Sequence, residues 1–212
     1  MAEQLKIFIA DDHLLIREGL KKLLVYETDL KIVGEADNPD DTLDFVSKNE
    51  VDILILDINL PGKSGLDILK QLKMFKPDLH VLILSMYPEE QFAERTLKAG
   101  ASGYLTKESA PDELINAIRR VAKGGKYISH QLAEKLIFKK DAEYELPHQS
   151  LSDREFQVLK LMARGKSQVD ISAELNLSTS TINTYRSRIL EKLGLKSNAE
   201  LIHYALQNKL ID

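Results

Sequence analysis

Five short runs of β-favouring apolar residues occur in the first half of the chain, and an amphipathic segment follows each of them. Such runs predict strands that are buried on both faces, and the amphipathic segments have the apolar period of helices. The alternation predicts a parallel sheet with helices on both faces. We expect strands at Lys6–Ala10, Lys31–Ala36, Asp52–Asp57, His80–Leu84 and Gly103–Leu105, and helices at His13–Tyr26, Pro39–Lys48, Ser64–Phe75, Glu89–Ala99 and Pro111–Ala122.

After residue 150 the strand-like runs stop and helix-capping residues recur at close intervals. A capping box, Ser152-Asp153-Arg154-Glu155, begins the first of four expected helices. The second is short and ends near Asn176, and the third, Thr179–Leu193, is closed by Gly194. Because only Asn176-Leu177-Ser178 joins these two, they resemble a helix-turn-helix. The fourth helix begins near Ser197-Asn198.

The two patterns predict two domains. We assign residues 1–125 to an α/β domain, residues 126–149 to a linker that contains a short helix at Ser129–Ile137, and residues 150–212 to a small all-α domain. Residues 1–149 hold 20 Lys+Arg and 26 Asp+Glu, a net −6, whereas residues 150–212 hold 9 and 7, a net +2, and the sum is the −4 of the whole chain. The mildly basic second domain is a weak indication of contact with nucleic acid.

Composition excludes several classes of site. The chain has 212 residues and no cysteine, so it has no disulfide and no cysteine-based zinc site, and its five histidines show no ligand spacing. No apolar run approaches the roughly 20 residues of a membrane span, and the first residues lack the pattern of a signal peptide. We therefore expect a cytoplasmic protein with no membrane partner.

Acidic, hydroxyl and ammonium side chains stand where the predicted strands end. The first strand ends at Asp11 and Asp12, the third at Asp57 and the fourth at Ser85, and Lys107 follows the fifth. Strand ends are often polar, so any one of these residues has an ordinary explanation. Together, at the edge where open α/β sheets bind ligands, they predict one site.

Three carboxylates in one pocket suit a small hard cation such as Mg²⁺. The chemistry that fits the set is phosphoryl transfer onto an aspartate: Asp57 would attack in line, and Lys107 and the Ser85 hydroxyl would hold the phosphoryl oxygens. The alternative, a phosphatase of the haloacid dehalogenase type, needs a second acid two residues after the nucleophile, where this chain has Asn59. We therefore expect no enzyme beyond self-phosphorylation and slow autodephosphorylation.

These residues resemble a known family. Asp11-Asp12, Asp57 with Pro61-Gly62, Ser85 and Lys107 are similar to the receiver domain of bacterial two-component response regulators. The segment GASGYLTK and the tail LSDREFQVLKLMARGKSQVDISAELNLSTSTINTYRSRILEKLGL resemble the NarL/FixJ subfamily with its LuxR-type helix-turn-helix. The resemblance covers nearly the whole chain outside the linker. It implies a five-stranded, doubly wound, flavodoxin-like receiver followed by a four-helix LuxR-type domain.

The resemblance also implies roles for individual residues. Asp57 would be the phosphoacceptor. Asp12, Asp57 and the backbone carbonyl of Asn59 would bind Mg²⁺, and Asp11 would help through water. Ser85 and Tyr104 would match the family's switch pair, although a tyrosine here would also serve as an ordinary core aromatic.

The expected helix Thr179–Leu193 has one polar face. At 100° per residue, Ile182, Tyr185, Ile189 and Leu193 share the opposite face, which would pack in the core. Asparagine and arginine read base edges, and basic or hydroxyl groups meet phosphates. We expect base contacts from Asn183, Thr184, Ser187 and Arg188, and phosphate contacts from Thr181, Arg186, Lys192 and Lys166.

The leading hypothesis is a transcription factor controlled by phosphorylation. A sensor histidine kinase would supply the phosphoryl group, and the partners would be promoter double-stranded DNA and a second copy of the chain once phosphorylated. A contact with RNA polymerase is compatible with this role. The alternatives are a DNA-binding protein that ignores phosphorylation, which an incomplete acidic pocket would favour, and a helical tail that binds protein instead of DNA.

Overall fold

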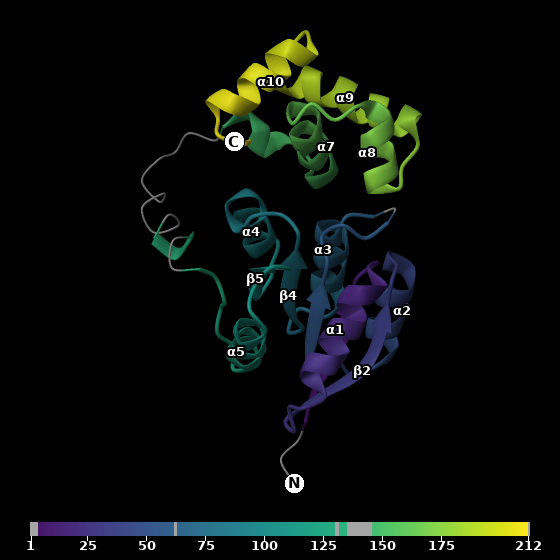
Figure 1. Cartoon of the computed structure of the whole chain (residues 1–212), viewed down its shortest axis with the longest axis vertical. Helices are drawn as coiled ribbons and strands as arrows, with labels where there is room; N and C mark the ends of the chain where they lie inside the picture. Colours follow the sequence, from purple (N-terminus) through teal and green to yellow (C-terminus); the bar gives the residue numbers. More distant parts are fainter. Residues whose placement is uncertain (1–3, 62, 130–131, 135–145, 212) are drawn as a thin grey trace. The chain divides into compact units, whose positions relative to one another are not determined.

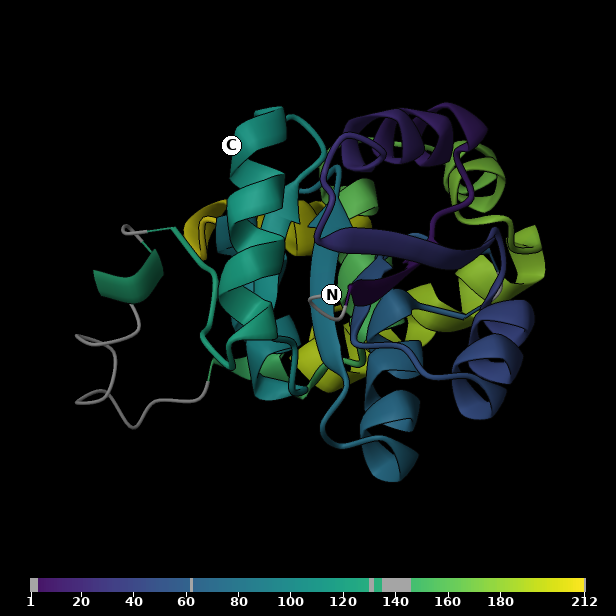
Figure 2. The ribbon, with the colours of Figure 1, turned by 90° about the horizontal axis from the view of Figure 1, so that it is seen from below.

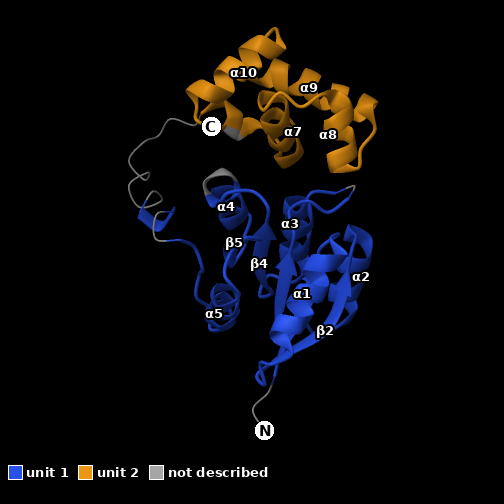
Figure 3. Ribbon diagram, viewed as in Figure 1, with its two compact units in different colours: residues 1–140 blue, residues 141–212 orange. Residues whose placement is uncertain are grey.

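Two compact units make up the chain, residues 1–140 and residues 141–212 (Figure 3). The computed structural model describes residues 4–61, 63–129, 132–134 and 146–211, apart from the side chains of residues 90, 91 and 149. In this part of the chain no helix has both the length and the apolar character needed to cross a membrane.

The first unit is built on a sheet of five parallel strands (Figure 1). Its order, β2-β1-β3-β4-β5, is that of the flavodoxin-like doubly wound folds. The order reverses between β1 and β3, which pair directly, with Ala10 opposite Leu56. The strands are β1 (Leu5–Ala10), β2 (Leu30–Ala36), β3 (Ile53–Leu56), β4 (His80–Ser85) and β5 (Gly103–Thr106).

Helices cover both faces of this sheet, as the view from below in Figure 2 shows. One core layer joins β-strand residues to α1 and α5, through side chains such as Leu20, Leu24 and Ile118. On the other face Phe8 of β1 stacks on Phe45 of α2, with ring centroids 4.5 Å apart. The helices are α1 (Leu14–Leu24), α2 (Pro39–Lys48), α3 (Gly65–Phe75), α4 (Glu89–Lys98) and α5 (Pro111–Ala122).

Local sequence explains where the helices begin. Asn38 and Ser64 cap α2 and α3 with side chains that accept from the backbone N–H of Asp41 and Leu66. Pro111 is the first residue of α5, where its missing N–H has no intrahelical partner to lose. These residues therefore determine where each of the three helices begins.

The second unit is helical in its described part. Its elements are the 3₁₀ helix η2 (Pro147–Ser150) and the helices α7 (Asp153–Ala163), α8 (Gln168–Leu175), α9 (Thr179–Leu193) and α10 (Asn198–Gln207). The expected capping box is present, because Ser152 and Glu155 each bind the other's backbone N–H. Asn176, in the left-handed conformation with φ of 50°, ends α8 and turns the chain into α9.

The predicted fold class is confirmed, a five-stranded parallel sheet followed by a helical domain. Element ends differ from the predicted ones by a residue or two; β3, for example, ends at Leu56, so that Asp57 lies just beyond it. Of the short helix expected at Ser129–Ile137, residues 132–134 are helical and most of the others lie outside the described residues. Residues 138–145 of the expected linker also lie outside them.

Candidate functional site

The acidic residues meet at the point where the strand order reverses. Asp11 directly follows β1 and Asp57 directly follows β3, and the Asp57 N–H donates to the carbonyl of Ala10 at 2.9 Å. Both carboxylates are buried, with exposed fractions of 2% and 1%, whereas Asp12 is partly exposed. The reversal of strand order thus produces a crevice with two buried acids and a third at its rim.

Lys107, which directly follows β5, contacts the cluster of Asp11, Asp12 and Asp57, here called the acid pocket. Its Nζ lies 2.7 Å from Asp11 Oδ2 and 2.8 Å from Asp57 Oδ2, and its own side chain is only 2% exposed. The Lys107 backbone N–H donates to the carbonyl of Ser85 at 2.8 Å, which fixes the turn after β5 against the end of β4. The residues that the sequence placed at strand ends are therefore brought together.

The loop after Asp57 holds its carboxylate in place. The N–H of Asn59 donates to Asp57 Oδ1 at 3.0 Å, and the N–H of Gly65 donates to the carbonyl of Ile58 at 2.9 Å. A Cβ at residue 65 would lie 2.3 Å from the Asp57 carbonyl oxygen. Only glycine therefore allows α3 to begin this close to the acid pocket.

Burial and the surrounding charges affect the two central ionisable groups differently. Burial raises the pKa of the Asp57 carboxyl; Lys107 lowers it, Asp11 adds to the rise, and the Asn59 N–H opposes it, with a net rise. Burial lowers the pKa of Lys107, but Asp57 and Asp11 together outweigh this, so that its pKa rises. The ammonium therefore stays charged beside two acids that it only partly neutralises.

The residues of the acid pocket fit a divalent cation. Asp11, Asp12, Asp57 and also His13 each offer a ligand atom, and these atoms lie within 4.8 Å of one another. Two of the carboxylate oxygens are buried: Asp11 Oδ2 lies 2.7 Å from Lys107 Nζ, and Asp12 Oδ1 lies 2.7 Å from His13 Nδ1. Carboxylate oxygens in this number are the ligands of hard divalent cations.

His13 is a residue of the acid pocket that the sequence analysis missed. Its Nδ1 lies 2.7 Å from Asp12 Oδ1 and 3.2 Å from Asp11 Oδ1, and its side chain is 56% exposed. The five histidines show no ligand spacing among themselves, so that criterion did not group His13 with the acids. The available signal was that His13 directly follows two carboxylates at the start of a helix.

Ser85 and Tyr104, the expected switch pair, lie next to each other in the structure. The Ser85 side chain is fully buried, and its Oγ accepts from the N–H of Tyr87 at 3.1 Å. The Tyr104 hydroxyl donates to the carbonyl of Tyr87 at 2.8 Å. Burial raises the pKa of Tyr104, and the Ser85 hydroxyl opposes the rise. Both side chains thus contact one short loop between β4 and α4.

The chain that leaves α5 is bound to this switch region. Tyr127 forms a parallel bridge beside Gly103 of β5: its N–H donates to Ser102 and its carbonyl accepts from Tyr104, both at 3.0 Å. The Ser129 N–H donates to the carboxylate of Glu89, the first residue of α4, at 2.8 Å. The first residues of the expected linker therefore contact β5 and α4.

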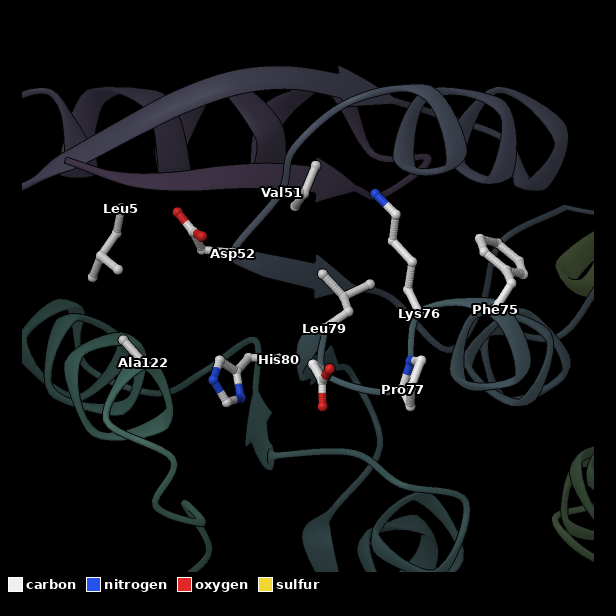
Figure 4. Close-up of a pocket in the computed structure, with 10 residues that line it drawn as sticks. Leu5, Val51, Asp52, Phe75, Lys76, Pro77, Leu79, His80 and Ala122 are labelled. Carbon is white, nitrogen blue, oxygen red and sulfur yellow. The ribbon is translucent and has the colours of Figure 1, made fainter. Parts of the chain in front are cut away.

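A pocket also lies at the opposite edge of the sheet, near the starts of β1, β3 and β4 (Figure 4). Its polar lining includes Asp52 and His80, and burial lowers the pKa of His80. Ligands of open α/β sheets bind at the other edge, where the strands end. We therefore keep the acid pocket as the candidate site.

In the second unit, α9 has the two faces that the sequence predicted. Of the four residues of the expected core face, Ile182 and Ile189 are fully buried, whereas Tyr185 and Leu193 are only partly buried. The polar residues of the opposite face, Ser180, Asn183, Thr184, Ser187, Arg188 and Glu191, are exposed. A two-faced helix after a short helix and a tight turn is the geometry of a major-groove reader.

The expected base-contacting residues differ in how they are held. Thr184 and Ser187 donate their hydroxyls to carbonyls one turn earlier in α9, at 3.0 and 3.1 Å. Asn183 Oδ1 accepts from Gln168 Nε2 of α8 at 2.9 Å. Arg188 is exposed and has no polar partner within the described residues.

The expected phosphate-contacting residues already have partners inside the unit. Thr181 Oγ1 lies 2.8 Å from Ser178 Oγ, and Arg186 Nε donates to Asn198 Oδ1 at 2.7 Å. Lys166 pairs with Glu174. Lys192 donates to Glu155 Oε2 at 2.6 Å and so ties α9 to the capping box of α7, a pairing that the sequence did not indicate. Each of these groups is partly or fully exposed and keeps further donors or acceptors.

An acid pocket closed by a lysine, at the switch point of an α/β sheet, is joined here to a helix-turn-helix unit. This combination defines a two-domain regulator with an input site and a DNA-binding output. Residues 7–119 match the family model of the response regulator receiver domain, and residues 149–205 match that of bacterial regulatory proteins of the luxR family. The chain belongs to the two-component response regulators of the NarL/FixJ family.

Relatives match the sequence of this chain over nearly its full length. The chain is 36% identical over 210 residues to the response regulator GacA of Pseudomonas aeruginosa, covering 98% of each chain. It is 33% identical over 208 residues to the response regulator UvrY of Escherichia coli, covering 97% of this chain and 95% of that one. It is also similar, with 27% identity and a TM-score of 0.60, to RcsB of Salmonella enterica bound to a promoter in the presence of the phosphomimetic BeF₃⁻, covering 95% of this chain and 98% of that one.

Proposed function

We propose that the protein is a transcription regulator whose DNA binding is controlled by phosphorylation of Asp57 from a sensor histidine kinase. The observation that carries this proposal is the buried Asp57 carboxylate at a strand end, with Lys107 Nζ at 2.8 Å and two more acids beside it. No other described group combines a nucleophilic oxygen, a cation and a divalent-metal ligand set in one crevice.

Each residue of the acid pocket has a role in this proposal. Asp12, Asp57 and the backbone carbonyl of Asn59 would hold Mg²⁺, and Asp11 would help through water; the ion would supply positive charge against the phosphate. An oxygen of Asp57 attacks phosphorus and forms the new P–O bond while the bond to the donor's leaving group breaks. Lys107 then pairs with a phosphoryl oxygen.

The Ser85 and Tyr104 side chains carry the change outward. The Ser85 hydroxyl turns from the Tyr87 N–H toward the phosphoryl group, and Tyr104 follows within the space beside it. The chain after α5 is bound to the backbone of Tyr104 and to Glu89 of α4, which supports transmission through these contacts. Phosphorylation thus biases an element with two states.

The protein is not an enzyme in this proposal beyond self-phosphorylation and slow autodephosphorylation. A phosphatase would need an acid to protonate the leaving group two residues after Asp57, and the amide of Asn59 cannot do so. In this proposal Asp57 therefore stores a phosphoryl group and does not turn over a substrate.

Residues 150–212 form the output domain, residues 1–125 the receiver and residues 126–149 the linker, and the protein acts in the cytoplasm. Asn183, Thr184, Ser187 and Arg188 contact bases, and Thr181, Arg186, Lys166 and Lys192 contact phosphates. A net charge of +2 on the output domain favours binding by a phosphorylated homodimer to two half-sites of promoter DNA, because one domain alone neutralises few phosphates.

The phosphoacceptor claim is tested by mass. The full chain is incubated with Mg²⁺ and a small phosphodonor, and its intact mass is measured. We expect one added phosphoryl group, absent in Asp57→Ala and retained in Asp67→Ala, which removes an exposed acid of α3. An unchanged mass of the unsubstituted protein would refute the claim.

The DNA contacts are tested by base preference and by salt. Asn183→Ala and Arg188→Ala should each change the preferred base at one position, whereas Arg186→Ala should weaken binding to every sequence and reduce the slope of log affinity against log salt by about 1. A uniform loss in all three variants would contradict the division between base and phosphate contacts.

A further inference from the structure

One hydrogen bond links the two helices of the helix-turn-helix on their exposed side. Gln168, the first residue of α8, donates its Nε2 to Oδ1 of Asn183, in the second turn of α9, at 2.9 Å. The two residues are 15 positions apart in the chain. The contact therefore depends on how the helices pack, and it engages a residue of the base-reading face.

Gln168 is not needed to begin α8. The capping box of Ser167 and Asp170 already satisfies that helix start: Ser167 Oγ accepts from the Asp170 N–H at 3.2 Å, and an oxygen of Asp170 accepts from the Ser167 N–H at 3.2 Å. Ser167 Oγ also donates to Asp170 Oδ2 at 2.6 Å. The side chain of Gln168 is thus available for the contact across to α9.

The contact restricts what Asn183 offers to DNA. An asparagine amide without a protein partner can direct either its oxygen or its nitrogen toward a base. It can also pair with adenine through both atoms at once. Here Oδ1 accepts from Gln168, which leaves the N–H groups of Nδ2 as the donors that Asn183 offers to DNA. Their partners in the major groove are acceptors: guanine O6 and N7, thymine O4 and adenine N7.

We propose that Gln168 is a positioning residue for specificity, which orients the Asn183 amide so that it reads a base carrying an acceptor at that position of the major groove. The inference rests on the proposed reading of DNA by α9. It adds a residue outside α9 to the set that determines the preferred sequence, although Gln168 itself need not touch a base.

Two substitutions of Gln168 distinguish the orientation of the Asn183 amide from the mere presence of a side chain at residue 168. Lysine only donates, so Gln168→Lys keeps Asn183 Oδ1 engaged and should retain the base preference. Glutamate only accepts, so Gln168→Glu engages Nδ2 and turns Oδ1 outward, toward the amino groups of adenine or cytosine. The added charges change overall affinity in opposite directions, but the relative preference among bases at one position is independent of overall affinity.

The experiment is selection of bound sequences from a randomised double-stranded DNA library by the full chain treated with beryllofluoride. At one position we expect Gln168→Lys to retain the preference, Gln168→Ala to weaken it by about fivefold or more, and Gln168→Glu to shift it toward adenine or cytosine. In an Asn183→Ala background, Gln168→Ala should cause no further change, and thermal unfolding identifies any variant that fails to fold.

Each alternative result has one meaning. If the unsubstituted chain enriches a motif and Gln168→Glu enriches the same one, the role of Gln168 is refuted while DNA recognition stands. If Gln168→Ala changes the enriched motif equally in the otherwise unsubstituted chain and in the Asn183→Ala background, Gln168 contacts DNA itself. The positioning role is then refuted. If the unsubstituted chain enriches no sequence, the proposed function itself fails.

Discussion

Asp57 is buried beside a second carboxylate, and one lysine serves both. Burial disfavours the ionised form of Asp57, and the nearby Asp11 charge adds to this, which is why the pKa of Asp57 is raised. A bound divalent cation, alone or with a transferred phosphoryl group, would change the net charge around Asp57. The buried charges therefore destabilise the unmodified receiver, and the same charges give the site its affinity for charged ligands.

Asp57→Asn should increase the free energy of unfolding of the metal-free protein at neutral pH by about 1 kcal/mol, because it removes a buried charge and leaves Lys107 paired with Asp11. Because the native pKa of Asp57 is raised, the stability due to its protonated form is complete below about pH 4 and is lost as pH rises through the native pKa. The gain should therefore vanish below about pH 4. Urea unfolding from pH 3 to pH 8 measures it.

The control for this prediction is Asp44→Asn, which removes an exposed carboxylate paired with Lys48. This change should alter stability by less than about 0.5 kcal/mol at every pH. A gain from Asp57→Asn that persists unchanged at pH 3 would contradict the account of its pKa.

Gly65 sets how closely α3 approaches the phosphoacceptor loop. Gly65→Ala would place a Cβ 2.3 Å from the Asp57 carbonyl oxygen and 2.7 Å from Ile58 Cα, so we expect a loss of stability of about 2 kcal/mol or more. Gly19→Ala is the matched control, because nothing lies within 4 Å of its Cβ in α1 and alanine favours the helix. Thermal unfolding should show the two variants shifting in opposite directions.

At the scale of elements, sequence predicted what depends on local pattern. Apolar alternation and helix caps gave the order of strands and helices, and the strand ends gave Asp57, Asp11 and Lys107, because parallel strands bring their ends to one edge. Contacts such as Gln168 with Asn183 or Lys192 with Glu155 were not predictable, because they depend on the docking of two helices and leave no periodic signal.

The contact between Lys192 and Glu155 holds α9 against α7. The Glu155 side chain is 3% exposed; burial alone raises its pKa, but Lys192 and Ser152 outweigh burial and lower it. Lys192→Ala should therefore destabilise the second unit by about 1 kcal/mol at neutral pH. Since the lowered pKa gives stability above about pH 4 that is lost as pH falls through the native value, the difference should shrink in acid.

Urea unfolding of the full chain measures this effect, with Lys196→Ala as the matched control. Lys196 is exposed in the same unit and its side chain has no partner within the described residues, so its removal should leave stability within about 0.5 kcal/mol. An equal loss in both variants would show that the pair with Glu155 contributes nothing specific.

The hydrogen bond from Ser129 to Glu89 ties the departing chain to α4. Glu89→Ala should speed hydrogen exchange of the Ser129 amide by about fivefold, whereas the Tyr127 amide, which donates to Ser102, should exchange as before. Glu108→Ala, at an exposed site in the loop after β5, is the control and should change neither rate. No change at Ser129 in Glu89→Ala would show that this bond does not hold the chain.

At the scale of the whole molecule, each unit has its own core. We expect calorimetry to resolve two unfolding transitions. Ile55→Ala in β3 should lower the temperature of one and Ile182→Ala in α9 that of the other, because each change reduces the free energy of unfolding of its unit by about 2–5 kcal/mol. Added Mg²⁺ should raise only the transition that Ile55→Ala lowers, because a ligand stabilises the unit that binds it. A single transition that Mg²⁺ and both substitutions shift would show that the two units unfold as one.

The bridge at Tyr127 also decides where the receiver can be cut. β5 is the last strand of the sheet, and an edge strand exposes unpaired backbone groups that attract other chains. Tyr127 covers part of this edge, and its carbonyl lies 2.7 Å from where a Cβ of Gly103 would be, so the cover fits only against glycine. A receiver fragment that ends at residue 123 would therefore expose the edge and self-associate, whereas one that ends at residue 134 keeps it covered and should remain monomeric without a phosphodonor.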